Sequence, residues 1–226
     1  MTRESSWKDL TVAMITRNEE KAVGKVIDDI KKIVPGAEIL VVDSSSDATA
    51  QIAEDLGARV IRQFPPRGYG PAMDTALRSA AGKVVVTLDC DDTYPTDQIP
   101  LIASDVLSEK WDVVDASRLE KKPKAMPWIS YIGNWTFAAL ATLAFRQRLT
   151  DLHSGMRAYS KAMLDELWFD PNGPALPVEL LLLPLRKRKR VKTVFIDYRE
   201  RIGESKTQPL VSSWWTLKRI LKARFS

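Results

Sequence analysis

The stretch Val84-Val-Val-Thr-Leu-Asp-Cys-Asp-Asp92 joins a short run of apolar and β-branched residues directly to three carboxylates. Similar runs occur at Leu10–Ile15, Glu38–Asp43 and Ala58–Ile61, and helical patterns lie between them, the clearest at Glu19–Ile33. Short apolar strands that alternate with amphipathic helices indicate a mostly parallel sheet with helices on both faces. We therefore predict a single-domain α/β fold.

Composition excludes several other classes of protein. The chain has 226 residues, 34 Lys and Arg, 29 Asp and Glu, one His and one Cys. Apolar residues are too plentiful for a disordered chain, and one cysteine excludes a disulfide scaffold. We expect no secretory signal, because Met1–Trp7 lacks an apolar core, and no membrane span. The longest nearly apolar stretch, Phe137–Phe145, is far shorter than the roughly 20 residues that spanning needs.

Polar loops follow three of the predicted strands, at Thr16–Glu20, Asp43–Asp47 and Asp89–Asp92. In parallel sheets, ligands bind at the carboxyl ends of the strands. Asp89 and Asp91 are two positions apart, so both carboxylates can face one hard cation such as Mg²⁺ or Mn²⁺. The alternative is a solvated acidic turn that caps the next helix.

Five motifs occur in an order that resembles the family 2 glycosyltransferases, and within them the dolichol- or polyprenyl-phosphate sugar synthases. The resemblance runs from about Thr11 to Leu221. The motifs are Asn18-Glu19, Val41-Val42-Asp43 with Ser45-Ser-Asp-Ala-Thr49, Asp89-Cys90-Asp91, Asp151-Leu-His-Ser-Gly-Met-Arg157 and Arg201-Ile-Gly-Glu-Ser-Lys206. The resemblance implies a Rossmann-like glycosyltransferase A fold.

The resemblance also implies a nucleotide-sugar donor site. Glu19 and Asp43 would contact the base or ribose, while Asp89 and Asp91 would hold the Mg²⁺ or Mn²⁺ that bridges the diphosphate. A divalent ion stabilises the negative charge that builds on a departing diphosphate. Ile15 and Arg17 stand where the family usually has Pro and Tyr. The full implied donor set is Ile15, Arg17, Glu19, Asp43, Arg67, Asp89, Cys90, Arg201 and Lys206.

On the acceptor side, the resemblance places Arg118, Ser130 and Ser205 against the acceptor, and Asp151 and Arg157 beside Asp89 and Asp91 at the reaction centre. A phosphate acceptor is already an anionic nucleophile and needs no strong base. A hydroxyl acceptor would require Asp151, Asp92 or His153 to take a proton. For His153, the only histidine, the alternative to a role as base is a structural role. Glu179 would lie on a helix behind the site and orient a basic partner.

The basic C-terminal part contrasts with an acidic body. From 186 to 226 there are 13 Lys and Arg and 3 Asp and Glu. Trp214, Leu217, Ile220 and Leu221 lie toward one face of a predicted basic helix, which suits an anionic membrane surface. Its alternative is a helix that docks on the body. The aromatic residues of 128–145 suit either a core or a membrane interface. We expect no nucleic-acid partner.

These inferences divide the chain into a nucleotide-sugar half at 1–116, an acceptor half at 117–206 and a basic helix at 207–226. The expected reaction moves a hexose from a GDP- or UDP-sugar to a polyprenyl or dolichyl phosphate, with inversion, at the cytoplasmic face of a membrane. Two alternatives stay open. One is a glycosyltransferase that acts on a hydroxyl of a small molecule or glycan, and the other is a non-catalytic protein that binds a nucleotide sugar or an anionic lipid.

Overall fold

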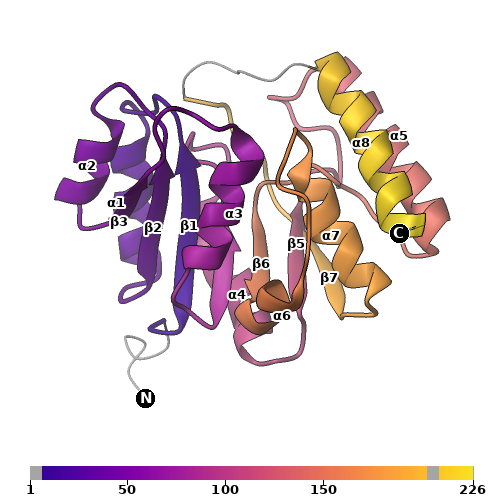
Figure 1. The fold of residues 1–226 in the computed structure, drawn as a ribbon, viewed down its shortest axis with the longest axis horizontal. Coiled ribbons are helices and arrows are strands. Elements are labelled where there is room, and N and C mark those ends of the chain that lie inside the picture. Colours follow the sequence, from indigo (N-terminus) through magenta and orange to yellow (C-terminus); the bar gives the residue numbers. More distant parts are fainter. Residues whose placement is uncertain (1–6, 203–208, 226) are drawn as a thin grey trace.

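The structure is a computed structural model and describes residues 7–202 and 209–225 (Figure 1). Its centre is one seven-stranded sheet in the order β3-β2-β1-β4-β6-β5-β7. The strands are β1 Leu10–Thr16, β2 Glu38–Asp43, β3 Arg59–Arg62, β4 Val84–Thr87, β5 Val113–Ser117, β6 Arg157–Ser160 and β7 Val191–Phe195. Only β6 runs antiparallel to its neighbours, β4 and β5. The predicted mostly parallel α/β sheet is confirmed.

Helices cover both faces of the sheet. The helices are α1 Val23–Ile33, α2 Thr49–Asp55, α3 Tyr69–Ser79, α4 Ile99–Leu107, α5 Trp128–Phe145, α6 Lys161–Glu166, α7 Leu176–Arg186 and α8 Pro209–Phe225, with a short 3₁₀ turn, η2, at Thr96–Gln98. One core layer lies under α1, α2 and α4, and a second lies under α3, α6 and α7. A third apolar cluster joins α5, α7 and α8. No helix in the described parts of the chain is long and apolar enough to cross a membrane.

The register aligns the carboxyl ends of β1 and β2, because Thr16 pairs with Asp43. Parallel pairing of β1 with β4 brings the loop after β4 to the same edge. The predicted loops therefore gather at one end of the sheet, as expected.

Two elements differ from the prediction. The first helix begins at Val23 rather than Glu19, because the loop before it bonds to the β2–α2 loop: the Glu19 amide donates to the Thr49 hydroxyl at 2.9 Å. Strand β6 was not predicted. It is short, and its first residue, Arg157, pairs with Asp115 on β5, 42 positions away. Helix α8 spans Pro209–Phe225, and positions 207 and 208 of the predicted helix lie outside the described residues. The proposed boundary at 116/117 falls inside β5.

Candidate functional site

The loops after β1 and β2 are tied into one unit. Asn18, which has a left-handed backbone (φ 55°), donates its amide to the Ser45 hydroxyl at 2.7 Å. Its side-chain oxygen accepts from the Ser46 amide at 2.9 Å. Together with the Glu19–Thr49 bond, these contacts fix where Glu19 stands at the end of β1.

Asp43 is fully buried at the end of β2. Its Oδ1 accepts from the hydroxyls of Thr16 and Ser45 at 2.7 and 2.6 Å. Its Oδ2 is 2.5 Å from Nη1 of Arg62. Because both oxygens are engaged inside the protein, the structure favours a positioning role for Asp43 over direct contact with a donor.

Asp89 and Asp91 follow β4. Asp91 is almost entirely buried, and its Oδ1 accepts from the Thr93 amide at 3.1 Å and from the Thr93 hydroxyl at 2.5 Å. Burial, together with the neighbouring Asp91 carboxylate, raises the pKa of Asp89 to about 7. Two adjacent carboxylates, one of them unfavourable to ionise, are the donor set that a divalent cation stabilises.

Gly155 packs directly against Asp89. A Cβ added at Gly155 would lie 2.8 Å from Oδ2 of Asp89, so only glycine leaves this carboxylate in place. Among the described residues, no three carboxylate, imidazole or thiolate side chains gather into a metal cage. A site with two carboxylates leaves coordination positions for water and substrate phosphates, as Mg²⁺ usually requires.

Arg201 joins the acidic pair to the β1 loop. Its guanidinium lies 3.1 Å from Oδ2 of Asp91 and 3.0 Å from Oε1 of Glu19. The next amide, that of Ile202, donates to the Asp91 carbonyl at 3.0 Å. The segment after β7 therefore crosses the carboxyl ends of the strands. Ser205 and Lys206 lie outside the described residues.

The predicted donor site also includes Ile15, Arg17, Arg67 and Cys90. Ile15 is partly buried at the end of β1, and Arg17 and Arg67 are exposed. The Cys90 side chain is buried in the core, and this burial raises its pKa far above the ordinary range. A contact between Cys90 and a donor would therefore have to come from its main chain.

Arg118 and Asp151 form a forked ion pair beside the acidic cluster. Nε and Nη2 of Arg118 lie 2.7 and 3.0 Å from the two carboxylate oxygens of Asp151. Burial works to raise the pKa of Asp151, but the Arg118 guanidinium overcomes it and lowers this pKa to about 2. The Arg118 guanidinium also lies over the Tyr198 ring, 5.1 Å from its centre. Asp151 is thus ionised and fully engaged.

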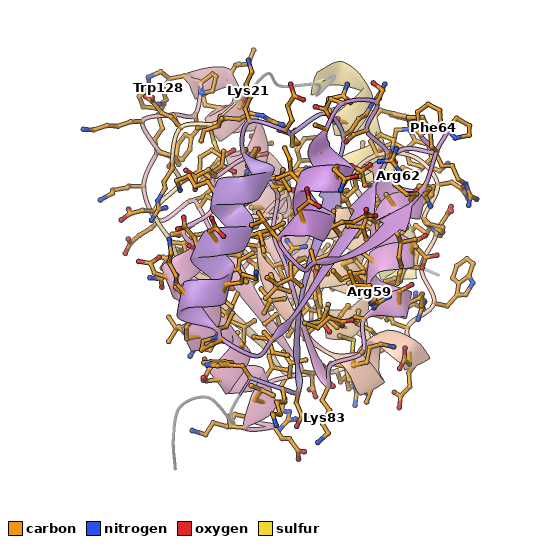
Figure 2. The ribbon with its side chains drawn as sticks, turned by 90° about the vertical axis from the view of Figure 1, so that its left-hand side faces the viewer. Lys21, Arg59, Arg62, Phe64, Lys83 and Trp128 are labelled. Carbon is orange, nitrogen blue, oxygen red and sulfur yellow. The ribbon has the colours of Figure 1, made fainter. Side chains whose placement is uncertain are left out.

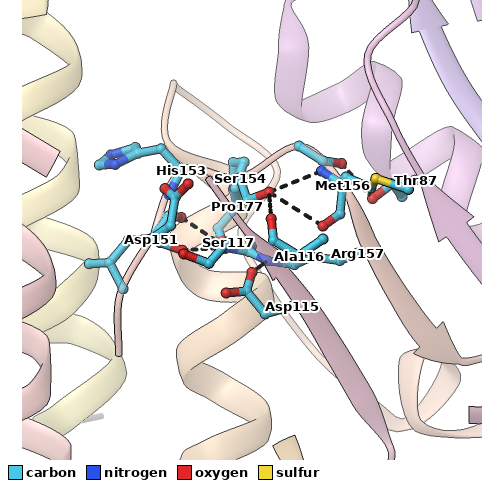
Figure 3. Close-up of polar contacts among 12 residues, drawn as sticks. Thr87, Asp115, Ala116, Ser117, Asp151, His153, Ser154, Met156, Arg157 and Pro177 are labelled. Carbon is cyan, nitrogen blue, oxygen red and sulfur yellow. Dashed lines mark hydrogen bonds and ion pairs between the residues drawn. The ribbon is translucent and has the colours of Figure 1, made fainter. Parts of the chain in front are cut away.

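Arg157 lies next to Asp151 and is completely buried (Figure 3). Nε is 2.5 Å from Oδ1 of Asp115, and the rest of the guanidinium donates to main-chain carbonyls of Pro177, Asp151 and Leu152. With no solvent-facing side, Arg157 has the geometry of a positioning residue that holds the 151–152 loop. Ser130 is exposed on the first turn of α5.

His153 and Glu179 both contact α8. Nε2 of His153 is 2.8 Å from the Thr216 hydroxyl. Glu179 is buried and pairs with Arg219 at 2.9 Å, which agrees with its predicted part in orienting a basic partner.

Sequence reasoning missed the aromatic pair behind the acidic cluster. The hydroxyl of buried Tyr94 accepts from the Gly155 amide at 2.7 Å, and its ring packs edge-on against Tyr198 with centres 5.7 Å apart. Tyr94 therefore helps to hold Gly155 beside Asp89. Its position immediately after the Asp cluster was the available signal.

Comparison with known proteins shows the family and the fold. The model of the family described as "Glycosyl transferase family 2" matches residues 11–168. A dolichyl-phosphate hexose transferase from Haloferax volcanii is 41% identical, over 97% of this chain and 95% of that protein. An undecaprenyl-phosphate mannosyltransferase from Micrococcus luteus is 27% identical, over 84% of each chain. Glucosyl-3-phosphoglycerate synthase from Mycobacterium tuberculosis, solved with Mn²⁺ and UDP, has a TM-score of 0.77 and 22% identity, over 98% of this chain and 81% of that one.

Proposed function

This chain belongs to glycosyl transferase family 2 and is a glycosyltransferase, and from this we propose that it moves a hexose from a GDP- or UDP-sugar onto a polyprenyl or dolichyl phosphate. The relatives named for dolichyl- and undecaprenyl-phosphate transfer support this acceptor. The Mn²⁺ held by the structural neighbour supports a divalent ion at Asp89 and Asp91.

The choice of acceptor rests on Asp151, His153 and Asp92. A hydroxyl acceptor would need one of these side chains to take its proton. Asp151 has a pKa of about 2 and is engaged by Arg118. Burial lowers the pKa of His153 to about 4. Asp92 is ion-paired with Lys25 at 2.8 Å. A general base works best with a pKa near the operating pH, so these groups favour a nucleophile that is already ionised, such as a phosphate.

The side chains of this site supply positioning and charge. Asp89 and Asp91 would hold the divalent ion, which stabilises negative charge on the departing diphosphate. Arg201 places a further cation beside Asp91 and Glu19, within reach of the same leaving group. Attack by the acceptor on the opposite side of the sugar inverts the anomeric carbon.

We also propose that the protein works at the cytoplasmic face of a membrane, because the proposed acceptor, a polyprenyl phosphate, is a lipid. The predicted contact through the basic C-terminal helix needs one revision. Ile220 of α8 faces the body, together with Thr216, Arg219 and Ala223, while Trp214, Leu217 and Leu221 are exposed. The helix is docked on the body, and three of the four predicted residues meet solvent, whereas Ile220 is buried.

The test is transfer from a panel of UDP- and GDP-sugars to a polyprenyl phosphate in detergent, with Mn²⁺ or Mg²⁺. We expect a glycolipid product that EDTA abolishes. Asp91→Asn should lower the rate by at least about 100-fold, because it removes one charge that fixes the ion. Asp92→Asn is the matched control and should change the rate by only a few fold, since Asp92 pairs with Lys25 instead.

Two results would contradict the proposal. Metal-dependent release of nucleotide without a lipid product would keep the donor site and direct the search to hydroxyl acceptors. Binding of a nucleotide sugar without any turnover would favour a non-catalytic binding protein.

A further inference from the structure

Helix α5 exposes an apolar face along its whole length. The helix has 18 residues and none of them is charged. At about 100° per residue, its exposed large apolar side chains fall within an arc of about 140°. These side chains are Trp128, Ile129, Ile132, Trp135, Leu140 and Leu143. Ala138 and Ala141 are buried on the opposite side and pack toward the body. The stripe is therefore a face that the chain itself leaves uncovered.

Helix α8 lies beside α5 (Figure 1). It adds a second apolar stripe. It is locked onto the body by Arg219, which pairs with Glu179 and donates to the Pro174 carbonyl at 2.9 Å. Its own exposed apolar side chains recur at helical spacing, at Trp214, Leu217, Leu221 and Phe225. Of the fourteen large apolar side chains exposed among the described residues, ten lie on these two helices. Such concentration marks an interaction surface rather than scattered exposure.

Cations border this surface and acids are absent from both helices. Lys121 and Lys124 precede α5, Arg146 and Arg148 follow it, and all four are exposed. Lys218 stands next to the α8 stripe and is also exposed. An apolar stripe with a basic border is complementary to an anionic bilayer. A second copy of the chain would bring the same cations against these, which disfavours a symmetric dimer through this face.

The surface adjoins the acceptor side of the proposed site. The His153 ring packs edge-on against Phe137 of α5, with centres 6.2 Å apart, and bonds to Thr216 of α8. The amide of His153 donates to Asp151, the partner of Arg118. In Figure 2, Trp128 lies at the top and Lys83, just before β4, at the bottom, so α5 begins at the end of the sheet where the strands finish.

We propose that α5 and α8 together form a bilayer-docking surface, with their apolar stripes in the interface of an anionic membrane. The docking residues of α5 extend the contact beyond the basic C-terminal helix. This arrangement presents the Arg118 side of the site to the membrane, where a lipid phosphate would enter. Only that last step rests on the proposed function, since adsorption to a bilayer is measured without turnover.

The test uses the full chain with two kinds of vesicle, phosphatidylcholine alone and phosphatidylcholine mixed with phosphatidylglycerol. Co-sedimentation and the blue shift of tryptophan emission report binding. We expect binding to the anionic vesicles that weakens with salt. The double variants Ile132→Ser with Trp135→Ser, and Leu217→Ser with Leu221→Ser, should each lower the partition coefficient about tenfold or more.

Phe64→Ser is the matched control. Phe64 is equally exposed but lies beside β3, and Figure 2 shows it pointing away from the body. It should leave binding unchanged. A second pair, Lys121→Gln with Lys124→Gln, should weaken binding to anionic vesicles only. All these side chains are exposed, and thermal unfolding checks that each variant is folded.

Absence of binding to anionic vesicles by the unmodified protein would overturn the proposal, as would an equal loss in Phe64→Ser. A dimer that the α5 variant dissociates, without any vesicle binding, would assign the face to a second copy and overturn it as well. Transfer to a detergent-dispersed acceptor is measured in parallel. Vesicle binding without transfer would contradict the proposed function alone, and transfer without vesicle binding would contradict the docking surface alone.

Discussion

Replacement of His153 by glutamine should change how the stability of the protein depends on pH. The Thr216 hydroxyl has one proton, which it donates to the Ser212 carbonyl at 2.8 Å. Nε2 of His153 must therefore carry the proton in its 2.8 Å bond to Thr216. Nδ1 is buried and has no hydrogen-bond partner among the described residues. A second proton on this ring would create a buried charge without a partner.

The magnitude follows from the pKa. Burial lowers the pKa of His153 from 6.5 to about 4, against the opposing effect of Asp151. Between pH 6.5 and about 4, His153 is protonated in the unfolded chain and neutral in the folded protein. The free energy of unfolding therefore falls as the pH falls. The full loss is roughly 3 kcal/mol, and about 2.5 kcal/mol of it is reached by pH 4.5. Above pH 7 the histidine is neutral in both states and contributes no pH dependence.

The assay is urea unfolding of the unmodified protein and of His153→Gln between pH 7.5 and 4.5. The carboxylates titrate in both proteins, so the difference between the two curves isolates the histidine. We expect the variant to lose less stability on acidification, by about 2 to 3 kcal/mol at pH 4.5. Parallel curves would refute the reasoning, because they would mean that His153 takes up its proton equally in the folded and unfolded states.

Three glycine substitutions test the packing of the protein, one beside Asp89, one on α3 and one on α5. Gly155→Ala should weaken Mn²⁺ binding about tenfold or more with the fold intact, because the added Cβ would push Asp89 aside. Electron paramagnetic resonance of Mn²⁺ measures this affinity, and an unchanged affinity would contradict Asp89 as a metal ligand. Gly70→Ala places a Cβ 1.8 Å from the Pro171 carbonyl oxygen and should destabilise the protein by about 1 to 3 kcal/mol in urea unfolding. Gly133→Ala on α5 meets nothing within 4 Å and should stabilise the protein by up to about 1 kcal/mol, so a loss of stability there would count against the open space on that side of the helix.

The resemblance of the motifs assigned residues that are far apart in the sequence to one donor site. It placed Glu19, Asp91 and Arg201 together, and the structure joins them by ion pairs across 182 positions of sequence. It could not show that Asp43 and Arg157 are enclosed. Enclosure depends on Arg62, Asp115 and main-chain carbonyls that approach only after folding.

The amino-acid pattern alone predicts the parallel strands β1 to β4, the first helix and the edge at which the acidic loops meet. These features follow from local apolar patterns and from the rule that parallel strands end on the same side. Which face of α5 is exposed follows only from its packing in the folded protein, because apolar residues occur all around that helix and its periodicity is weak. The tertiary structure also decided that β6 inserts antiparallel between β4 and β5 and that Asp151 is engaged by Arg118. Burial and pairing are properties of surfaces that meet, and a linear pattern does not specify which surfaces those are.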